Sequence, residues 1–238
     1  MAATIFSNKK HKSIKPAIVK LLKSVKLDAI VAVGGDGTFL RAFREGARTN
    51  KPVLCIRSGN SKGVLAEGGA SEFEKMAQKI KAGGFSIIKY PMLEGRTEKQ
   101  RLSGFNEIGF FRRTEEALRF DLFVNNVLFY ENVVADGGII ATPAGSTAYN
   151  ISSGGPVLDL ASQSLVFTPL NPHGLNKPVV FEGSAKIVFK RHGAQAFADG
   201  KKLPAVKRYL EIFKSGKSAK VISLKTPFYT KWRRIVGI

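Results

Sequence analysis

The chain has 238 residues, of which 44% are hydrophobic and 24% charged, as expected for a globular protein with one large domain or two modest ones. A single cysteine, Cys55, excludes an intramolecular disulfide framework, and no apolar run is long enough to span a membrane, so we expect a cytoplasmic protein. The net charge of +20 predicts attraction to anions, but the basic residues lack the aromatic interleaving that would favour nucleic acid.

The N-terminal part of the chain alternates predicted strands and helices. The expected elements are a strand at 2–6, a helix at 13–26, a buried strand at 29–33, a second helix, and a strand at 52–56. This order is typical of an open parallel sheet with crossover helices. A further helix is expected at 71–82, with Ser71 as its N-cap and Glu74 completing a capping box.

From Phe85 onwards the predicted elements are mostly short strands. They are expected at 86–90, 107–113, 118–124, 127–135, 138–141, 178–181, 185–189 and 209–213. Asn125-Asn126 is typical of a tight turn between two of them. The sequence therefore predicts an α/β N-terminal domain at 1–84 and an all-β domain of layered sheets or a sandwich at 85–224. The amphipathic segment 225–238 is expected to pack back onto the first domain as a helix.

A glycine-rich turn, Gly34–Thr38 (GGDGT), joins the buried strand to the second helix, for which Thr38 is the expected N-cap. Such a turn brings backbone N–H groups close to an anion at the positive end of the helix dipole. A carboxylate there repels phosphate unless it binds a cation or accepts a proton, so Asp36 is either catalytic or simply solvated. A dinucleotide fingerprint and a Walker P-loop are both excluded, because Leu40 and Glu211 stand where those motifs need glycine.

Two later segments carry candidate ligand-binding groups. Asn106-Glu107, at the start of a predicted strand, offers donors and acceptors that suit an adenine edge or a ribose diol, or forms a purely structural pair. Asp136-Gly137 leads to 142–149 (TPAGSTAY), whose small residues permit close approach of a ligand. Ser146 or Thr147 is expected to cap a short helix there. Nucleophilic catalysis by Ser146 would need a base, and the spacing of the histidines suggests none.

Together these motifs resemble those of the NAD kinase family. The resemblance rests on Gly34–Thr38, Asn106-Glu107, Asp136-Gly137, Thr142–Tyr149, Gly154-Gly155-Pro156, Pro172–Leu175 and Asp199-Gly200. It implies an α/β domain followed by a β domain, and a homo-oligomer, either a dimer or a tetramer. It also implies transfer of a terminal phosphoryl group from ATP, or from a donor such as polyphosphate, to the adenosine-ribose 2′-hydroxyl of NAD. The product is NADP, and Mg²⁺ would accompany the donor.

The resemblance also implies roles for individual residues. Asp36 would be the catalytic base. The phosphoryl donor is expected to contact Gly34, Gly35, Gly37 and Thr38. NAD is expected to contact Asp36, Gly37, Arg41, Asn106, Glu107, Asp136, Ala144, Thr147, Ala148, Tyr149 and Ser152. No cluster of cysteines and histidines predicts a metal site built from protein ligands alone.

Two other functions stay open from the sequence. The GGDGT turn is shared with diacylglycerol and sphingosine lipid kinases and, in variant form, with phosphofructokinases, so a lipid or sugar kinase is the first alternative. The second is a non-catalytic protein that binds nucleotides or nucleic acid. Phosphorylation of lipid with NAD left untouched would identify the first, and ligand binding without turnover would identify the second.

Overall fold

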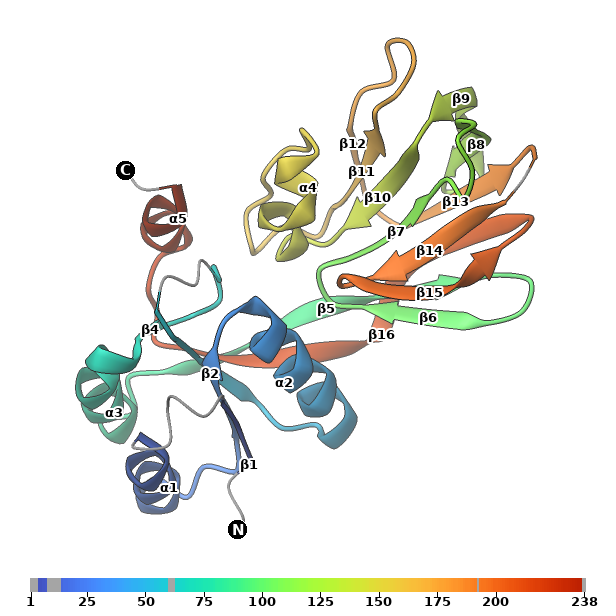
Figure 1. Cartoon of the computed structure of the whole chain (residues 1–238). Coiled ribbons are helices and arrows are strands. Elements are labelled where there is room, and N and C mark those ends of the chain that lie inside the picture. The colour runs from blue at the N-terminus through green and yellow to red at the C-terminus, as the bar shows by residue number, and fades with distance from the viewer. Residues whose placement is uncertain (1–3, 8–13, 60–62, 192, 237–238) are drawn as a thin grey trace. The chain divides into compact units, whose positions relative to one another are not determined.

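The structure is a computed structural model that describes residues 4–7, 14–59, 63–191 and 193–236 (Figure 1). Its helices are α1 (Lys15–Ser24), α2 (Asp36–Thr49), α3 (Phe73–Lys81), α4 (Tyr149–Ser152) and α5 (Phe228–Val236). None of these helices, within the described ranges, is long and apolar enough to cross a membrane. The chain forms two compact units, unit 1 at Met1–Tyr90 with Lys217–Ile238, and unit 2 at Pro91–Gly216. The sequence predicted boundaries after residues 84 and 224, whereas the units divide after Tyr90 and after Gly216.

Unit 1 is built around a parallel sheet. Its strands are β1 (Thr4–Ser7), β2 (Ile30–Gly34), β3 (Val53–Arg57) and β4 (Gly68–Gly69), with the end of the long strand β16 (Tyr209–Ser223) beside β3. The pairs β1–β2, β2–β3, β3–β4 and β3–β16 are all parallel. The open parallel sheet predicted from the N-terminal sequence is therefore confirmed.

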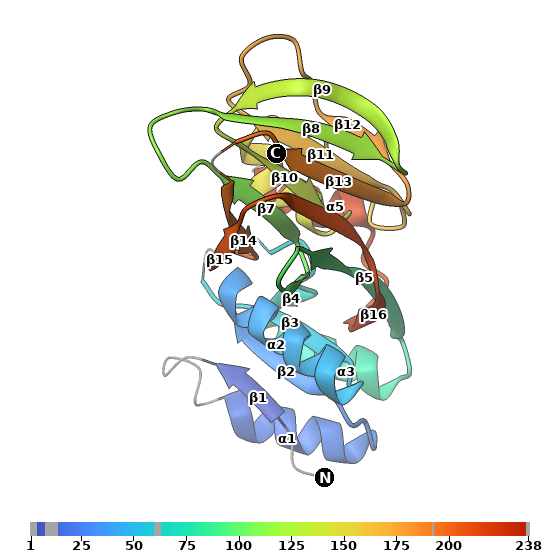
Figure 2. The same ribbon diagram turned by 90° about the vertical axis from the view of Figure 1, so that its right-hand side faces the viewer.

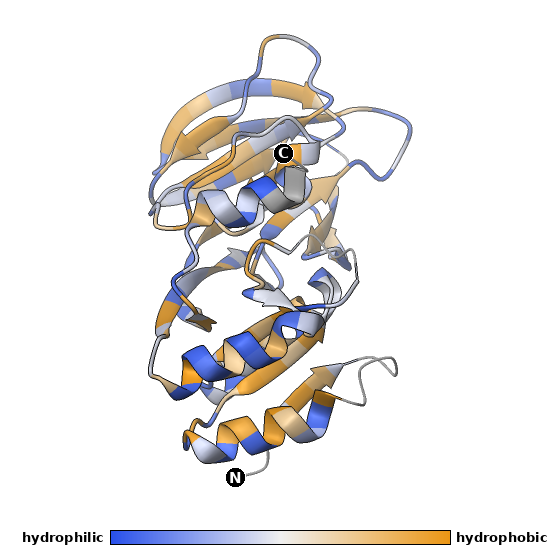
Figure 3. Cartoon of the chain, turned by 90° about the vertical axis from the view of Figure 1, so that its left-hand side faces the viewer, coloured by the Kyte–Doolittle hydropathy of each residue, from blue (hydrophilic) through white to orange (hydrophobic). Residues whose placement is uncertain are grey.

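The helices of unit 1 cover both faces of this sheet. Apolar residues of α1 and α3 share one core cluster with alternate residues of β2 and β3, so these two helices pack on the same face. Helix α2 lies against the other face, where a Cβ at Gly46 would come within 2.8 Å of the Val53 side chain. Figure 3 shows the matching pattern, because the helices carry hydrophilic and hydrophobic stripes while the strands are largely hydrophobic.

The capping residues expected for two of these helices are wrong. Helix α2 begins at Asp36 with Gly35 as its N-cap, so Thr38 lies inside the first turn. Before α3 the chain forms a 3₁₀ turn at Ala70–Glu72, and the Glu72 carboxylate accepts the Gly69 N–H at 2.6 Å. Glu72 therefore does the capping that the sequence assigned to Ser71 and Glu74, because the chain turns a few residues earlier than expected.

Unit 2 consists of two layers of antiparallel strands (Figure 2). The strands are β5 (Ser86–Arg96, entering from unit 1), β6 (Arg101–Gly104), β7 (Glu107–Phe111), β8 (Leu118–Val124), β9 (Val127–Ala135), β10 (Gly137–Ala141), β11 (Leu165–Leu170), β12 (Val179–Phe181), β13 (Ser184–Phe189), β14 (Ala194–Ala198) and β15 (Lys201–Val206). One layer has the order β12-β11-β10-β7-β14-β15, and the other contains the start of β16 followed by β13, β8 and β9.

The core of unit 2 lies between its two layers. Phe110 of β7 and Phe167 of β11 share one buried cluster with Phe120 of β8 and Phe189 of β13. Phe110 makes edge-to-face contacts with Phe120 and Phe189, with ring centroids 5.1 and 5.3 Å apart. The predicted all-β architecture of layered sheets is thus confirmed.

Candidate active site

The glycine-rich turn of unit 1 links β2 directly to α2. Gly34 ends the strand, and a Cβ at this position would lie 2.4 Å from the Thr38 Oγ1, so only glycine fits there without a shift. The N–H groups of Thr38 and Phe39 donate to the Gly35 carbonyl at 2.9 and 3.1 Å, which closes the first helical turn. The positive end of the α2 dipole therefore points at this turn, an arrangement that suits an anionic ligand.

Asp36 projects from the first residue of α2. Its side chain is exposed, yet the surrounding protein restricts its hydration enough to raise the pKa of the carboxyl above its ordinary value. One close neighbour is the backbone at Gly63, where a Cβ would come within 2.6 Å of Asp36 Oδ1. An accessible carboxylate with a raised pKa is suited to accept a proton from a hydroxyl.

The backbone at Gly37 is open to a ligand, whereas the Arg41 side chain contacts another part of unit 1. A Cβ at Gly37 would meet nothing within 4 Å. The Arg41 guanidinium lies over the ring of Phe6, 5.5 Å from its centroid. The sequence predicted an NAD contact for both residues, and in this structure Arg41 is occupied by a cation–π contact within unit 1.

In unit 2, a buried carboxylate holds the turn that carries Asn106 and Glu107. Asp199 accepts the backbone N–H groups of Phe105 at 3.0 Å, Asn106 at 2.8 Å and Glu107 at 3.4 Å. The Asn106 carbonyl in turn accepts the Thr142 N–H at 2.9 Å. Two residues far away in the sequence, Asp199 and Thr142, thus hold the Asn106-Glu107 pair in position.

The Glu107 side chain is only 4% exposed. Burial, and secondarily the negative charge of Asp199, raise the pKa of its carboxyl to about 8. Within the described residues its buried Oε2 has no hydrogen-bond partner. A buried acceptor without a partner is costly, so this oxygen is ready to pair with a ligand hydroxyl.

Asp136 lines a cavity of about 430 Å³ in unit 2. Its carboxylate bonds Arg112 Nε at 2.9 Å and accepts a hydrogen bond from Asn171 Nδ2 at 3.0 Å. Tyr149 and Ser152, both predicted NAD contacts, line the same cavity. A volume of this size falls within the range of small-molecule sites.

The Tyr149 ring, 39% exposed, stands next to two other aromatic rings. The Phe111 and Phe197 rings stack with centroids 4.8 Å apart, and Tyr149 lies 6.2 and 6.0 Å from them. Phe111 also lines the cavity. The cavity therefore offers aromatic surface next to charged groups, which suits a ligand with a planar ring and polar substituents.

The hydroxyl-rich segment before Tyr149 is packed internally. Ser146 is fully buried, donates to the Pro143 carbonyl at 2.7 Å and accepts the Leu158 N–H at 3.0 Å, so nucleophilic catalysis by Ser146 is excluded. Helix α4 has Ala148 as its N-cap, with no side-chain cap, so the expected capping by Ser146 or Thr147 is wrong.

The other predicted contacts of this segment differ in accessibility. Thr147 donates its hydroxyl to the Ala144 carbonyl at 3.1 Å, and it is half-buried like Ala148. Ala144 is buried, 5% exposed, so at this position only its backbone is suited to a ligand contact.

The predicted site residues thus fall into two sets, Gly34–Arg41 in unit 1 and Asn106–Ser152 in unit 2. The sequence did not point to Arg112 or Asn171 as partners of Asp136. The signal lies in strand pairing, because β7 and β10 align Phe111 with Gly137 and so bring Arg112 next to Asp136. That register depends on the sheet and has no local sequence pattern.

The chain matches two family models, the ATP-NAD kinase N-terminal domain over residues 3–85 and the ATP-NAD kinase C-terminal domain over residues 110–224. The NAD kinase of Rickettsia akari is 36% identical over 173 residues, which cover 68% of this chain and 65% of that protein. The NAD kinase of Caldicellulosiruptor saccharolyticus is 32% identical over 207 residues, which cover 85% of this chain and 79% of the relative.

Two solved structures have a similar fold. An NAD kinase from Archaeoglobus fulgidus in complex with ATP has a TM-score of 0.83 and 25% identity, covering 99% of this chain and 98% of the other. A yeast NADH kinase complexed with NADH shares the fold, with a TM-score of 0.75 and 22% identity over 88% of this chain and 64% of the other. The match to the Rickettsia akari protein spans slightly less than two thirds of that protein's length. Because the two family models together match most of the residues of this chain, the chain belongs to the NAD kinase family.

Proposed function

We propose that this protein transfers the terminal phosphoryl group of ATP to the 2′-hydroxyl of the adenosine ribose of NAD, forming NADP and ADP. Membership of the NAD kinase family and the likeness to an NAD kinase solved with ATP support this assignment. The observation that carries it is Asp36, an accessible carboxylate of raised pKa at a glycine turn that suits phosphate.

In the proposed reaction Asp36 accepts the proton of the 2′-hydroxyl as its oxygen forms a bond to the terminal phosphorus. The bond from that phosphorus to the bridging oxygen breaks, and ADP leaves with the electron pair. An alcohol is a weak nucleophile, so a carboxylate in hydrogen-bond range lowers the barrier. Gly34, Gly35, Gly37 and Thr38 would surround the donor phosphates at the N-terminus of α2.

NAD would bind through groups of unit 2. The unpartnered oxygen of Glu107 suits a ribose hydroxyl, and the side-chain amide of Asn106 adds a donor and an acceptor beside it. The Tyr149 ring would stack on a planar base, and Asp136 would accept from the second ribose or from the nicotinamide amide.

The described residues contain no group of three or more His, Cys, Asp and Glu side chains placed to hold a metal ion. Mg²⁺ is commonly bound through substrate phosphates together with only one or two carboxylates, so it would reach this site with the phosphoryl donor. Bound Mg²⁺ would offset the negative charge on the donor phosphates. We therefore expect chelation by EDTA to abolish NADP formation, and added Mg²⁺ to restore it.

A homo-oligomer, dimer or tetramer, is part of the proposal. Strand β9 lies at the end of its layer, and its residues Val127, Leu128 and Phe129 are 68%, 46% and 49% exposed. An exposed apolar edge strand is prone to pair with another chain. Light scattering after size-exclusion chromatography should report an oligomer that Phe129→Glu dissociates, whereas an unchanged mass would remove β9 from the interface.

The test is incubation with NAD, ATP and Mg²⁺ followed by detection of NADP. Asp36→Asn should lower kcat by roughly 10²- to 10⁴-fold, the usual contribution of a general base. NAD affinity should stay within about tenfold, or about 1.4 kcal/mol. Asp28→Asn is the matched control, because Asp28 is a surface carboxylate paired with Lys51 at 2.8 Å.

Near-normal turnover in Asp36→Asn would remove the base role. Parallel reactions with polyphosphate in place of ATP, and with diacylglycerol in place of NAD, test the donor and the acceptor. Phosphorylated lipid without NADP would replace the proposal by the lipid-kinase alternative, which the relatives do not favour.

A further inference from the structure

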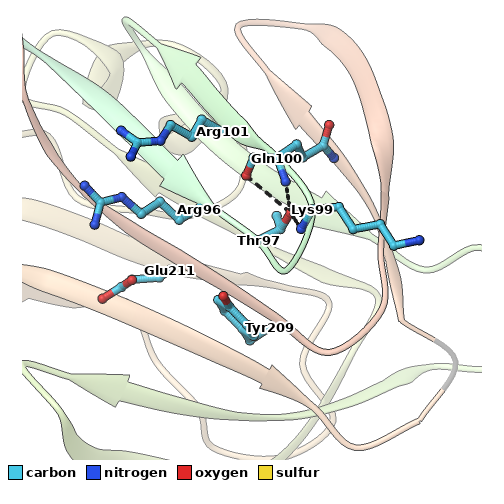
Figure 4. A pocket seen from close by; sticks show the side chains of 7 residues that line it. All are labelled: Arg96, Thr97, Lys99, Gln100, Arg101, Tyr209 and Glu211. Atoms are coloured by element: carbon cyan, nitrogen blue, oxygen red, sulfur yellow. Dashed lines mark hydrogen bonds between the residues drawn. The ribbon is translucent and has the colours of Figure 1, made fainter.

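A second cavity in unit 2, of about 580 Å³, lies at the hairpin formed by β5 and β6. Its lining includes Arg96, Lys99 and Arg101 from the hairpin and Tyr209 and Glu211 from β16 (Figure 4). It shares no lining residue with the cavity at Asp136. The proposed NAD kinase reaction assigns no role to any of these side chains, so the cavity needs a separate explanation.

The two arginines of this cavity are direct cross-strand neighbours. Arg96 on β5 and Arg101 on β6 are Cα partners in the antiparallel register. Like charges directly opposite each other destabilise a strand pair. A single carboxylate, Glu94, contacts both guanidinium groups, at 3.2 Å from Arg96 and 3.1 Å from Arg101. One negative charge is thus shared by two cations, and positive charge is left over.

The guanidinium groups are nevertheless accessible to a ligand. The Arg96 and Arg101 side chains are 46% and 74% exposed. The Arg96 guanidinium lies over the Phe213 ring, 4.5 Å from its centroid, so it is supported from one side. Lys99, at the end of the hairpin, adds a third exposed cation. The acid that lines the cavity, Glu211, lies across from Lys186 of β13 in the strand register, and the Lys186 ammonium lies over the Tyr209 ring, 5.1 Å from its centroid.

The hairpin end that carries these cations is held in place by the neighbouring turn. The Glu98 carboxylate accepts the backbone N–H of Lys207 at 2.9 Å, between β15 and β16. The Thr97 Oγ1 accepts the backbone N–H groups of Lys99 and Gln100, at 3.2 and 3.1 Å, which tightens the turn (Figure 4). A ligand would therefore meet a hairpin that is already ordered, which lowers the entropy cost of binding.

We propose that this hairpin cavity is a binding site for a phosphate chain, carried either by free inorganic polyphosphate or by a nucleoside triphosphate. The planar guanidinium fork matches pairs of phosphate oxygens, and the two arginines present two forks side by side. The phosphate oxygens would also relieve the repulsion between Arg96 and Arg101. The inference does not depend on the proposed NAD kinase reaction.

The test is hydrogen–deuterium exchange on the intact protein, read at peptides that cover residues 96–101 and 207–211. The ligands are sodium tripolyphosphate and ATP, each without Mg²⁺, with sodium sulfate at matched ionic strength as the control for screening. We expect tripolyphosphate or ATP to slow exchange at these peptides and sulfate not to do so. Protection by tripolyphosphate would show that a free chain suffices, and protection by ATP alone would identify a nucleotide as the source.

Variants distinguish binding at this hairpin from the general attraction of anionic ligands to a basic protein. In the double variant Arg96→Gln/Arg101→Gln, the ligand concentration needed for half-maximal protection should rise at least tenfold. Arg101→Gln alone is the milder variant. Lys20→Gln/Lys23→Gln removes the same charge from the exposed face of α1 and should leave the protection unchanged. Absence of protection by both ligands, equal protection by sulfate, or an equal loss in both double variants would overturn the proposal. NADP formation by the arginine variants reports separately on the proposed reaction.

Discussion

A buried ion pair anchors the C-terminal helix α5 within unit 1. Lys231 Nζ donates to Glu67 Oε1 at 2.5 Å, and the two side chains are 6% and 0% exposed. Among the described residues the second oxygen, Glu67 Oε2, has no hydrogen-bond partner. Glu67 therefore depends on Lys231 for the compensation of its charge, and we expect Lys231→Met to be strongly destabilising.

The magnitude follows from the burial of both groups. Removing one partner of a buried pair leaves an uncompensated charge and costs about 3–5 kcal/mol. For a chain of this length that corresponds to a fall in Tm of roughly 10 °C. The double variant Glu67→Leu/Lys231→Met removes both charges and replaces them by apolar side chains. It should lie within about 1–2 kcal/mol of the parent, because a buried pair gains little over an apolar pair.

The assay is urea unfolding at pH 7 followed by circular dichroism, on the parent, both single variants and the double variant. Lys75→Met on the exposed face of α3 is the control and should change stability by less than about 0.5 kcal/mol. A loss below about 1 kcal/mol in Lys231→Met, or a double variant as unstable as the sum of the singles, would refute the reasoning. The Glu67 charge also acts on Cys55, a fully buried thiol whose pKa is raised by burial and by this carboxylate.

Further predictions concern unit 2. Asp199→Asn weakens the bonds that hold the turn before β7, so NAD affinity should fall by about 1–3 kcal/mol, measured by calorimetry. Since folding raises the pKa of Glu107 from 4.5 to about 8, the folded state keeps a proton that the unfolded state releases, and stability should fall as pH rises through this window. In urea titrations, the stability of Glu107→Gln should not decline over this pH range. A pH profile identical to that of the parent would contradict this prediction. Tyr149→Ala should cost about 1–3 kcal/mol in NAD binding, whereas Tyr149→Phe should bind like the parent if the ring stacks on a base.

Local signals in the sequence located many elements correctly. The strands at Leu118–Val124 and Val127–Ala135 have the predicted bounds, and Asn125 and Asn126 form the turn between them with φ of 50° and 67°. Asparagine tolerates this left-handed conformation, so the turn is encoded in two adjacent residues. The helix expected from the amphipathic C-terminal stretch is also present, as α5.

Helix caps and some strands could not be predicted in the same way. Several polar residues near each helix start are able to cap, and the one used depends on where the neighbouring strand ends, as with Gly35 in place of Thr38. Strands β14 and β15 were not among those expected, although the family motif Asp199-Gly200 forms the turn between them. Their assignment needs β7 as a partner, which is far away in the sequence.

The amino-acid sequence alone was enough to identify the glycine turn with its carboxylate, the α/β and all-β parts, and the family. Each of these features depends on neighbouring residues and their spacing. The folded arrangement added the Arg112–Asp136 pair, the burial of Glu107 beside Asp199, and the opposed arginines of the β5–β6 hairpin. These features arise from strand register and from burial. Both join residues many positions apart, and no local pattern encodes them.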